Sequence, residues 1–498
     1  MAHGDKRESV SIKRLFTGVP GLDEALGGGL PEYSFNLIAG SPGAGKTTLI
    51  QQIMFTLATP ELPALYFTVA GEPTLKMLRY QQQFAFFDTT KLNSSIRFIN
   101  LSEEALEADL TALLGTIVSE VQQASPGMVV VDSFRSVVRA ARVADGRGMA
   151  LDDFLQRLAL HLTAWQATTF LVGEYPESDL QDNPVFTVAD GILWLSQSIE
   201  RNSVVRKLQV VKIRGQASVP GLHTMRITDA GIHVFPRMFR RPSSSVAPRP
   251  EKRLSVGTAE LDGMLGGGIP AWDSVLVAGP SGSGKTALAA QFIAEGLKLG
   301  QPGVVAMFEE RPGEYLKRAR ALGLDLEVMI RDRLLEVIYL RPLDLSVDEA
   351  LLEIQAAVGR VAAERLVIDS LSGFELALAP TFREDFRESL YRMVGTITAS
   401  GVTVFMTSEV TESFTDLHFS PDLVSFLTDD IILQRYVEME GKLRKVMTVV
   451  KMRGSHHSNA LWTYEITDAG LVLDKMLAGY TGIITGVARR EFPGEPHG

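Results

Sequence analysis

Two glycine-rich segments of the chain carry residue types that are suited to hold phosphate. Residues 40–47 read GSPGAGKT and residues 279–286 read GPSGSGKT, and both fit the pattern G-x-x-x-x-G-K-[ST]. Glycines let backbone N–H groups turn towards phosphate oxygens, and the helix expected after each segment adds the partial positive charge of its N-terminus. The lysine of each segment is expected to reach the β- and γ-phosphates of a nucleoside triphosphate. The chain is therefore predicted to bind ATP at two sites.

Each predicted site takes in the whole loop and the residue that follows it. A chance glycine-rich turn is the alternative, but two matches that each follow an apolar run and precede a helical pattern make chance negligible. The expected nucleotide-binding residues of the first site are Gly40, Ser41, Pro42, Gly43, Ala44, Gly45, Lys46, Thr47 and Thr48. Those of the second site are Gly279, Pro280, Ser281, Gly282, Ser283, Gly284, Lys285, Thr286 and Ala287.

A magnesium ion is expected beside each triphosphate. The hydroxyl groups of Thr47 and Thr286 are expected to ligate it. An aspartate also ends an apolar, strand-like run in each half of the chain: Asp132 follows 128–131 and Asp369 follows 366–368. We assign both carboxylates to the Mg²⁺ shell, acting through water or through the threonine. The alternative is that each aspartate caps a turn or a helix.

Hydrolysis or phosphoryl transfer also needs a carboxylate near the γ-phosphate. Residues 304–308 form a strand pattern that ends at Glu309 and Glu310, so these two residues and Lys285 are predicted to be catalytic. The register-matched positions of the first half, 70 and 71, are Ala70 and Gly71. The first site is therefore expected to bind ATP but to hydrolyse it poorly. A local shift that brings Glu72 into place is the alternative.

The elements around both sites belong to a long internal repeat. Residues 15–49 and 254–288 align at a constant offset of 239, with 17 of 35 positions identical. The same offset relates VVKIRG to VVKMRG and 228–231 to 467–470. A period of this length indicates duplicated domains rather than a solenoid of small units.

Near-continuous apolar runs of strand length alternate with helical patterns in each copy, for example 35–39, 65–69, 128–131 and 169–172 in the first. This pattern is typical of βαβ units around a buried parallel sheet. The fold class is predicted to be α/β, with two tandem P-loop (RecA-like) domains, each a mostly parallel sheet flanked by helices. The expected boundaries are 1–241 for the first domain, 242–251 for a proline- and serine-rich linker, 252–474 for the second domain and 475–498 for a mobile tail.

Composition narrows the classes of function. Hydrophobic residues make up 45% and charged residues 22% of the 498 residues, as in ordinary globular chains. The absence of cysteine excludes disulfides, thiolate zinc sites and a cysteine nucleophile. No apolar run is long enough to span a membrane and the N-terminus does not read as a secretory signal, so a cytoplasmic protein is expected. A net charge of −10 makes nucleic acid an unlikely partner, although a local basic groove remains open.

These residues resemble the KaiC family, the double-domain RecA-like ATPases that include the cyanobacterial circadian clock kinase. The resemblance covers about residues 10–480 and rests on both phosphate loops, the LxxGGGxP sequence before each of them, the tandem Glu309-Glu310 and the run 429–455. It implies a homohexamer of two stacked rings with ATP at the subunit interfaces. It also implies that Lys212, Arg214, Lys451 and Arg453 reach the γ-phosphate of a neighbouring subunit, and that KaiB-like or other signalling proteins are partners. A solvated strand face is the alternative for the four cations.

The resemblance also implies a phospho-acceptor. KaiC-like second domains phosphorylate adjacent serine and threonine residues before a D-x-I-I-L run. Ser425 matches that serine, but Phe426 occupies the threonine position, so a two-site phosphorylation cycle is not expected. Glu309 would be the base for Ser425; a structural, unphosphorylated Ser425 is the alternative.

Three functions follow from these readings. The first is a KaiC-like signalling ATPase that turns over mainly in its second domain, with serine autokinase activity on Ser425 across a subunit interface. The second is a DNA-dependent RecA-like motor, because the same core serves both classes. The third is a nucleotide-gated scaffold with little turnover, which Ala70 and Gly71 favour for the first domain.

Overall fold

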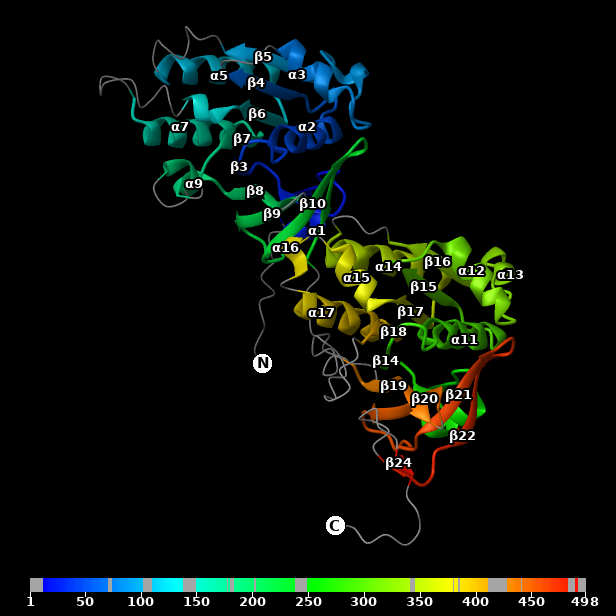
Figure 1. Cartoon of the computed structure of the whole chain (residues 1–498). Helices are drawn as coiled ribbons and strands as arrows, with labels where there is room; N and C mark the ends of the chain where they lie inside the picture. Colours follow the sequence, from blue (N-terminus) through cyan, green and yellow to red (C-terminus); the bar gives the residue numbers. More distant parts are fainter. Residues whose placement is uncertain are drawn as a thin grey trace, which may run out of the picture. The chain divides into compact units, whose positions relative to one another are not determined.

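The computed structural model describes residues 12–69, 74–101, 110–137, 149–176, 178–179, 183–200, 203–237, 249–340, 345–378, 380–383, 386–410, 428–439, 441–481 and 489–490. The chain divides into two compact units, Met1–Met238 and Phe239–Gly498, each of which contains one copy of the repeat. The first unit is drawn from blue to green in Figure 1 and the second from green to red.

The first unit alternates strands with helices along most of its length. Its strands are β1 (Arg14–Leu15), β2 (Leu30–Pro31), β3 (Phe35–Gly40), β4 (Ala64–Val69), β5 (Ile96–Leu101), β6 (Met128–Asp132), β7 (Thr168–Glu174), β8 (Gly191–Glu200), β9 (Ser203–Ile213), β10 (Leu222–Thr228) and β11 (Gly231–Phe235). Its helices are α1 (Leu22–Leu26), α2 (Lys46–Leu57), α3 (Thr74–Gln81), the 3₁₀ turn η1 (Thr89–Lys91), α5 (Leu110–Ala124), α7 (Leu151–Ala164) and α9 (Pro184–Val188).

Among the described residues of this unit, nine strands form one sheet in the order β11-β10-β9-β8-β3-β7-β6-β4-β5. The pairs from β8 to β5 are parallel, and β9, β10 and β11 extend the sheet as antiparallel strands. Both faces are covered, because consecutive β3 side chains enter different cores. Leu37 packs in the core that includes α5 and α7, whereas Ile38 packs in the core that includes α1 and α2. This is why the strand sequences are apolar throughout instead of alternating.

The second unit repeats the pattern. Its strands are β12 (Arg253–Leu254), β13 (Ile269–Pro270), β14 (Ser274–Gly279), β15 (Gly303–Met307), β16 (Leu335–Tyr339), β17 (Arg365–Asp369), β18 (Thr403–Glu409), β19 (Asp430–Met439), β20 (Lys442–Met452), β21 (Trp462–Thr467), β22 (Gly470–Met476), β23 (Tyr480–Thr481) and β24 (Arg489–Arg490). Its helices are α10 (Ala259–Met264), α11 (Lys285–Lys298), α12 (Pro312–Ala321), α13 (Glu327–Arg331), α14 (Val347–Val361), α15 (Leu371–Ala377), α16 (Pro380–Arg383) and α17 (Phe386–Ala399).

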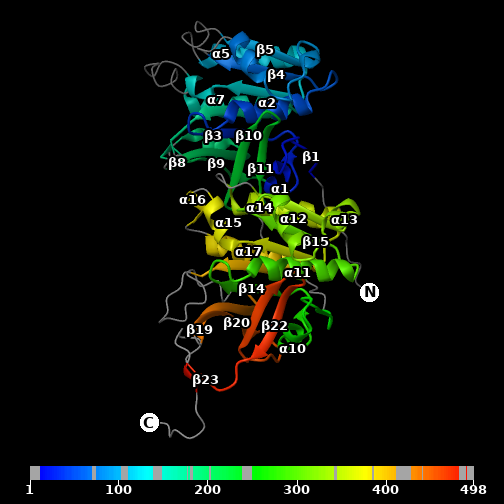
Figure 2. The ribbon, with the colours of Figure 1, turned by 45° about the vertical axis from the view of Figure 1, so that its right-hand side comes forward.

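Nine strands of the described part of the second unit form a sheet in the order β16-β15-β17-β18-β14-β19-β20-β21-β22. The antiparallel strands β20 to β22 extend it, in orange and red in Figure 2. Helix α10 lies beside β22 in the same view, and the hydroxyl of its N-cap, Thr258, donates to the carbonyl of Leu471 in that strand. The predicted fold class is therefore confirmed in both units. The bounds of the four predicted segments stay predictions; within the predicted tail, β23 pairs with β24.

In each unit the central strand leads into the phosphate loop. β3 ends at Gly40 and α2 begins at Lys46, while β14 ends at Gly279 and α11 begins at Lys285. Because the neighbouring strands are parallel, their carboxyl ends lie at the same edge of the sheet as the loop. The fold thus gathers the ends of several strands around each loop.

Candidate active site

The loop of the second domain holds its lysine against the backbone. Gly284 has φ +107, a left-handed conformation that favours glycine, and a Cβ there would lie 2.7 Å from Ile466 Cδ1. Lys285 then opens α11, and its Nζ donates to the carbonyls of Gly279 and Pro280, each at 2.8 Å. Burial lowers the pKa of Lys285, an effect opposed by the nearby carboxylates, first among them that of Glu409. The sequence pattern therefore produces the expected turn, with a half-buried ammonium at its centre.

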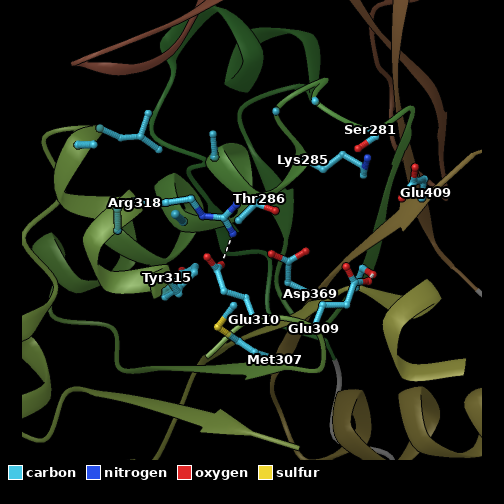
Figure 3. Close-up of a pocket in the computed structure, with 18 residues that line it drawn as sticks. Ser281, Lys285, Thr286, Met307, Glu309, Glu310, Tyr315, Arg318, Asp369 and Glu409 are labelled. Carbon is cyan, nitrogen blue, oxygen red and sulfur yellow. Dashed lines mark hydrogen bonds and ion pairs between the residues drawn. The ribbon is translucent and has the colours of Figure 1, made fainter. Parts of the chain in front are cut away.

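A cavity of about 490 Å³ opens beside this loop. Acidic side chains at or just after the ends of three strands line it together with the loop lysine and threonine (Figure 3). Its volume falls within the range of about 300–1,000 Å³ that is usual for ligand pockets. Its charged and hydroxyl-bearing lining residues are Ser281, Lys285, Thr286, Glu309, Glu310, Tyr315, Arg318, Asp369, Ser370 and Glu409.

Asp369 lies at the predicted metal position of the second domain, next to Thr286. It is the last residue of β17 and is 9% exposed. Its carboxylate accepts hydrogen bonds from the hydroxyls of Thr407 and Thr286. Burial raises the pKa of Asp369, and the two hydroxyl groups oppose that rise. The contact brings together the two residues that the sequence assigned to Mg²⁺ in the second domain.

Glu309 and Glu310 follow β15 but take different partners. Ser370 Oγ donates to Glu309 Oε1 at 2.6 Å, which holds this carboxylate next to the end of β17. Glu310 is paired with Arg318 of α12, and Figure 3 marks this contact with a dashed line. Burial raises the pKa of Glu310, while Arg318 lowers it. Of these two glutamates, only Glu310 has an arginine partner among the contacts described. Glu310 thus holds Arg318 at the cavity wall, and Glu309 is bound by a serine hydroxyl instead.

The first domain builds the same loop geometry. Lys46 Nζ donates to the carbonyls of Gly40 at 3.1 Å and Ser41 at 2.7 Å, and burial lowers its pKa. Thr47 Oγ1 donates to Asp132 Oδ2 at 2.9 Å. The Tyr66 hydroxyl donates to the same oxygen at 2.6 Å, and burial raises the pKa of this aspartate.

A magnesium ion suits both positions on the chemistry of the donors. Each offers one hydroxyl and one carboxylate, which are hard oxygen ligands. Among the described residues, no group of three or more His, Asp or Glu side chains could hold a metal by protein ligands alone. Mg²⁺ usually binds through one or two protein oxygens, substrate phosphates and waters, so this sparse donor set fits an ion that arrives with a nucleotide.

Two glutamates that the sequence analysis missed also face the loops. Glu174 ends β7 and Glu409 ends β18, and their register partners are Gly40 and Gly279, the first residues of the two loops. Glu174 Oε1 lies 3.9 Å from Lys46 Nζ. The two positions differ by 235 rather than 239, so the constant offset that revealed the repeat does not relate them.

The four predicted trans-acting cations lie away from the phosphate loops of their own domains. Arg214 pairs with Asp190 at 2.9 Å, and the Asp190 carboxylate also accepts from the backbone N–H of Phe35, the first residue of β3. Gly40 lies five residues further along β3, which is about 16 Å of strand. The second domain repeats this arrangement.

In the second domain Arg453 lies 3.7 Å from Asp429, and Lys451 Nζ donates to the carbonyl of Thr428. Lys212 Nζ in the first domain donates to the carbonyl of Thr187 at 3.2 Å. All four cations thus sit towards the amino ends of the central strands, away from the phosphate loop of their own domain. Ala70, Gly71, Glu72 and Ser425 lie outside the described residues.

No helix in the described ranges is long and apolar enough to cross a membrane.

The architecture and the two loops define a tandem P-loop ATPase of the RecA-like class. The family model described as "ATPase: KaiC" matches residues 15–238 and again residues 254–477. The chain therefore belongs to the KaiC family of ATPases.

Curated relatives agree over nearly the full length. The chain is 28% identical over 492 residues to the circadian clock oscillator protein KaiC of Rippkaea orientalis, covering 96% of this chain and 92% of that protein. It is 27% identical to the protein of the same name from Picosynechococcus sp., covering 96% and 93%. The circadian clock oscillator protein KaiC 1 of Synechocystis sp. is also 27% identical, covering 96% and 92%.

Proposed function

We propose that this chain is a KaiC-like signalling ATPase that binds Mg·ATP at both loops and hydrolyses it mainly in the second domain. The observation that carries the proposal is the cavity at the second loop, where Lys285, Thr286, Asp369 and Glu309 converge. Family membership supports ATP as the ligand.

Each side chain of this site has a role that its position supports. Lys285 would exchange its two backbone carbonyls for phosphate oxygens, because it already lies at the start of α11. Thr286 and Asp369 would hold Mg²⁺, which would neutralise charge on the β- and γ-phosphates. Glu309, held by Ser370, would orient the attacking water or hydroxyl and accept its proton.

The cations at the opposite end of each sheet support an assembled form. Lys451 and Arg453 are about three to five residues of strand away from their own loop, so they would act on the nucleotide of a neighbouring subunit. A cation supplied in trans offsets the charge that develops on the transferred phosphoryl group. Lys212 and Arg214 would do the same in the first domain. This arrangement requires self-association, and a homohexamer of two rings is the form we propose, with KaiB-like or other signalling proteins as candidate partners.

The serine autokinase activity is the most specific part of the proposal. Thr428, whose carbonyl binds Lys451, lies three residues after Ser425. An acceptor near 425 would therefore lie close in sequence to a cation that is proposed to act at the subunit interface. The base for Ser425 would be Glu309 of the subunit that holds the ATP.

The test is incubation of the purified full-length chain with Mg·ATP labelled at the γ-phosphate. Phosphate release and protein-bound label are measured in parallel with the Glu309→Gln variant and with Glu438→Gln, a matched change at an exposed position of β19. The proposal expects phosphate release from the parent chain and from the Glu438 variant, with a large loss in the Glu309 variant. Equal turnover in all three chains would refute the assignment of Glu309. An unchanged intact mass after incubation would remove the autokinase activity but leave the ATPase.

A further inference from the structure

The first domain carries a carboxylate and a guanidinium of its own at the phosphate loop. We infer that Glu174 and Arg135 are the hydrolytic pair of the first domain, in which Glu174 orients the attacking water and Arg135 contacts the γ-phosphoryl group. This inference rests on the proposed function, since it requires ATP at the first loop. It adds a catalytic arrangement to a domain whose positions 70 and 71 carry no carboxylate.

Strand register places Glu174 at the loop. β7 and β3 are parallel neighbours, and Glu174 is the residue opposite Gly40, where the chain leaves the strand to form the loop. Its Oε1 lies 3.9 Å from Lys46 Nζ, the group that is expected to reach the β- and γ-phosphates. The side chain is 46% exposed, so the carboxylate lies at an accessible edge of the sheet where water can reach it.

Arg135 reaches the same place from the neighbouring strand. It lies in the helical turn after β6, three residues beyond Asp132. Its Nη1 donates to the backbone carbonyl of Glu174 at 2.7 Å, which fixes the guanidinium beside the end of β7. The positive charge of Arg135 contributes to lowering the pKa of Lys46, so the two cations are close to each other. A guanidinium has five N–H donors and the carbonyl needs one, which leaves donors for phosphate oxygens.

The second domain differs from the first at the position of the guanidinium. Glu409 occupies the equivalent register position opposite Gly279, so the carboxylate is common to both domains. Three residues beyond Asp369, however, stands Ser372, whose Oγ accepts from the backbone N–H of Glu409 at 3.1 Å. The second domain has Glu309 and Glu310 in addition, with Arg318 bound to Glu310. Each domain therefore has a glutamate and an arginine beside its loop, but they come from different places. In the first domain Glu174 ends β7 and Arg135 follows β6, and in the second domain they are Glu310 after β15 and Arg318 of α12.

The reaction is the hydrolysis of ATP by water. The water oxygen forms a bond to the γ-phosphorus while the bond from that phosphorus to the β–γ bridging oxygen breaks, which gives ADP and inorganic phosphate. Glu174 accepts the proton that the water loses and passes it to solvent. Arg135 offsets the charge on the γ-phosphoryl oxygens, a role that an arginine can perform from within the same chain. Lys46 holds the β- and γ-phosphates throughout.

The experiment isolates the first domain. In a full-length chain carrying Glu309→Gln, Glu310→Gln and Glu409→Gln, the second loop still has its lysine and threonine but none of the glutamates that line its cavity, so the remaining turnover reports on the first site. Glu174→Gln and Arg135→Ser are added singly; the second change installs the residue type of the second domain. Phosphate release is measured at saturating Mg·ATP, and affinity is measured with a non-hydrolysable ATP analogue. Glu61→Gln and Arg157→Ser, at exposed positions of the same domain, are the matched controls.

We expect each variant of the pair to lower the remaining kcat by about tenfold or more, with analogue affinity changed by less than about threefold. Glu174→Asp restores part of the rate. The controls keep the rate of the background chain, and all chains keep its thermal unfolding midpoint.

Three results would overturn the inference. The first is a background chain that shows no turnover, and the second is full turnover after Glu174→Gln. The third is a Glu174→Gln chain that loses analogue affinity but keeps its kcat, which would make Glu174 a residue that only positions Lys46. In each case the parent chain still binds and hydrolyses Mg·ATP, so the proposed function survives. If the parent chain binds no nucleotide, the proposed function itself fails.

Discussion

Replacing the loop lysine of the second domain separates nucleotide binding from folding. Lys285→Met keeps an unbranched apolar side chain at the start of α11 and removes the ammonium. In the structure that ammonium donates two hydrogen bonds of 2.8 Å to backbone carbonyls. With ATP bound, the same donors are expected to serve phosphate oxygens.

The magnitude follows from these two bonds. A hydrogen bond to a charged group contributes about 1.5–3 kcal/mol, so two of them amount to about 3–6 kcal/mol. This corresponds to a loss of about 10²–10⁴-fold in nucleotide affinity or in turnover at the second site. Stability without nucleotide should change little, because burial disfavours the ammonium and lowers its pKa. The relief of that burial opposes the loss of two bonds, which limits the shift in Tm to about 2–4 °C.

The assay is calorimetric titration with Mg·ATPγS, paired with phosphate release and thermal unfolding without nucleotide. Lys298→Met is the matched control, because Lys298 lies in the last turn of the same helix with its side chain 66% exposed. An affinity at the second site within threefold of the parent would refute the reasoning. A collapse of Tm in the absence of nucleotide would also refute it, since the lysine would then be a structural residue.

Four further outcomes follow from the same structure. Glu309→Gln should lower phosphate release from the second site by about 10²-fold or more while leaving analogue affinity within about threefold, measured by single-turnover kinetics in a chain whose first loop is disabled by Lys46→Met. The Arg453→Ala variant by itself should lose the turnover of the second site. Mixed with a Lys285→Met chain it should regain part of that turnover, because one subunit then supplies the intact loop and its neighbour the arginine. Unchanged activity of the unmixed variant would contradict the trans assignment. Ser425→Ala should abolish any ATP-dependent mass gain of the intact chain while phosphate release continues. Burial, together with the nearby Asp273 carboxylate, raises the pKa of Asp430 to about 7. Between about pH 4 and pH 7 the folded chain therefore keeps a proton on Asp430 that the unfolded chain has released. The free energy of unfolding consequently falls as the pH rises through this window. Asp430→Asn should therefore raise the second domain's Tm at pH 8 by several degrees, corresponding to about 2–4 kcal/mol, and flatten its pH dependence in scanning calorimetry.

The fold and the loops were predictable because their determinants are contiguous in the sequence. A phosphate loop needs a strand, a glycine turn and a helix in direct succession. Residues 35–58 contain the patterns of all three, and the second copy repeats them. The positions of Asp132 and Asp369 at strand ends were also predictable, since each directly follows a buried apolar run, while their role in holding Mg²⁺ stays a prediction. The predicted strands were slightly short: β7, for example, runs from Thr168 to Glu174 rather than 169–172, because its ends are less apolar than its centre.

The residues that the sequence analysis missed depend on sheet order. Glu174 lies beside Gly40 because β7 pairs with β3, although more than 130 residues separate them in the chain. No local pattern encodes that pairing, and insertions between the strands shift the repeat offset, so alignment of the two copies did not reveal it either. Arg318 and Arg135 come from helical segments after neighbouring strands, where an arginine ordinarily reads as a solvated surface residue. The available signal was that Ala70 and Gly71 stand where the second copy has Glu309 and Glu310, so a carboxylate of the first domain had to come from elsewhere.

The most direct measurement of the central claim is the stoichiometry of nucleotide uptake by the full-length chain. Equilibrium titration with Mg²⁺ and a non-hydrolysable ATP analogue should give two bound nucleotides per chain, falling to one in either Lys46→Met or Lys285→Met. Removal of Mg²⁺ with a chelator should weaken both sites, because their side chains supply only a hydroxyl and a carboxylate to the ion. A chain that takes up no nucleotide, or one whose uptake is indifferent to both lysines, would contradict the account.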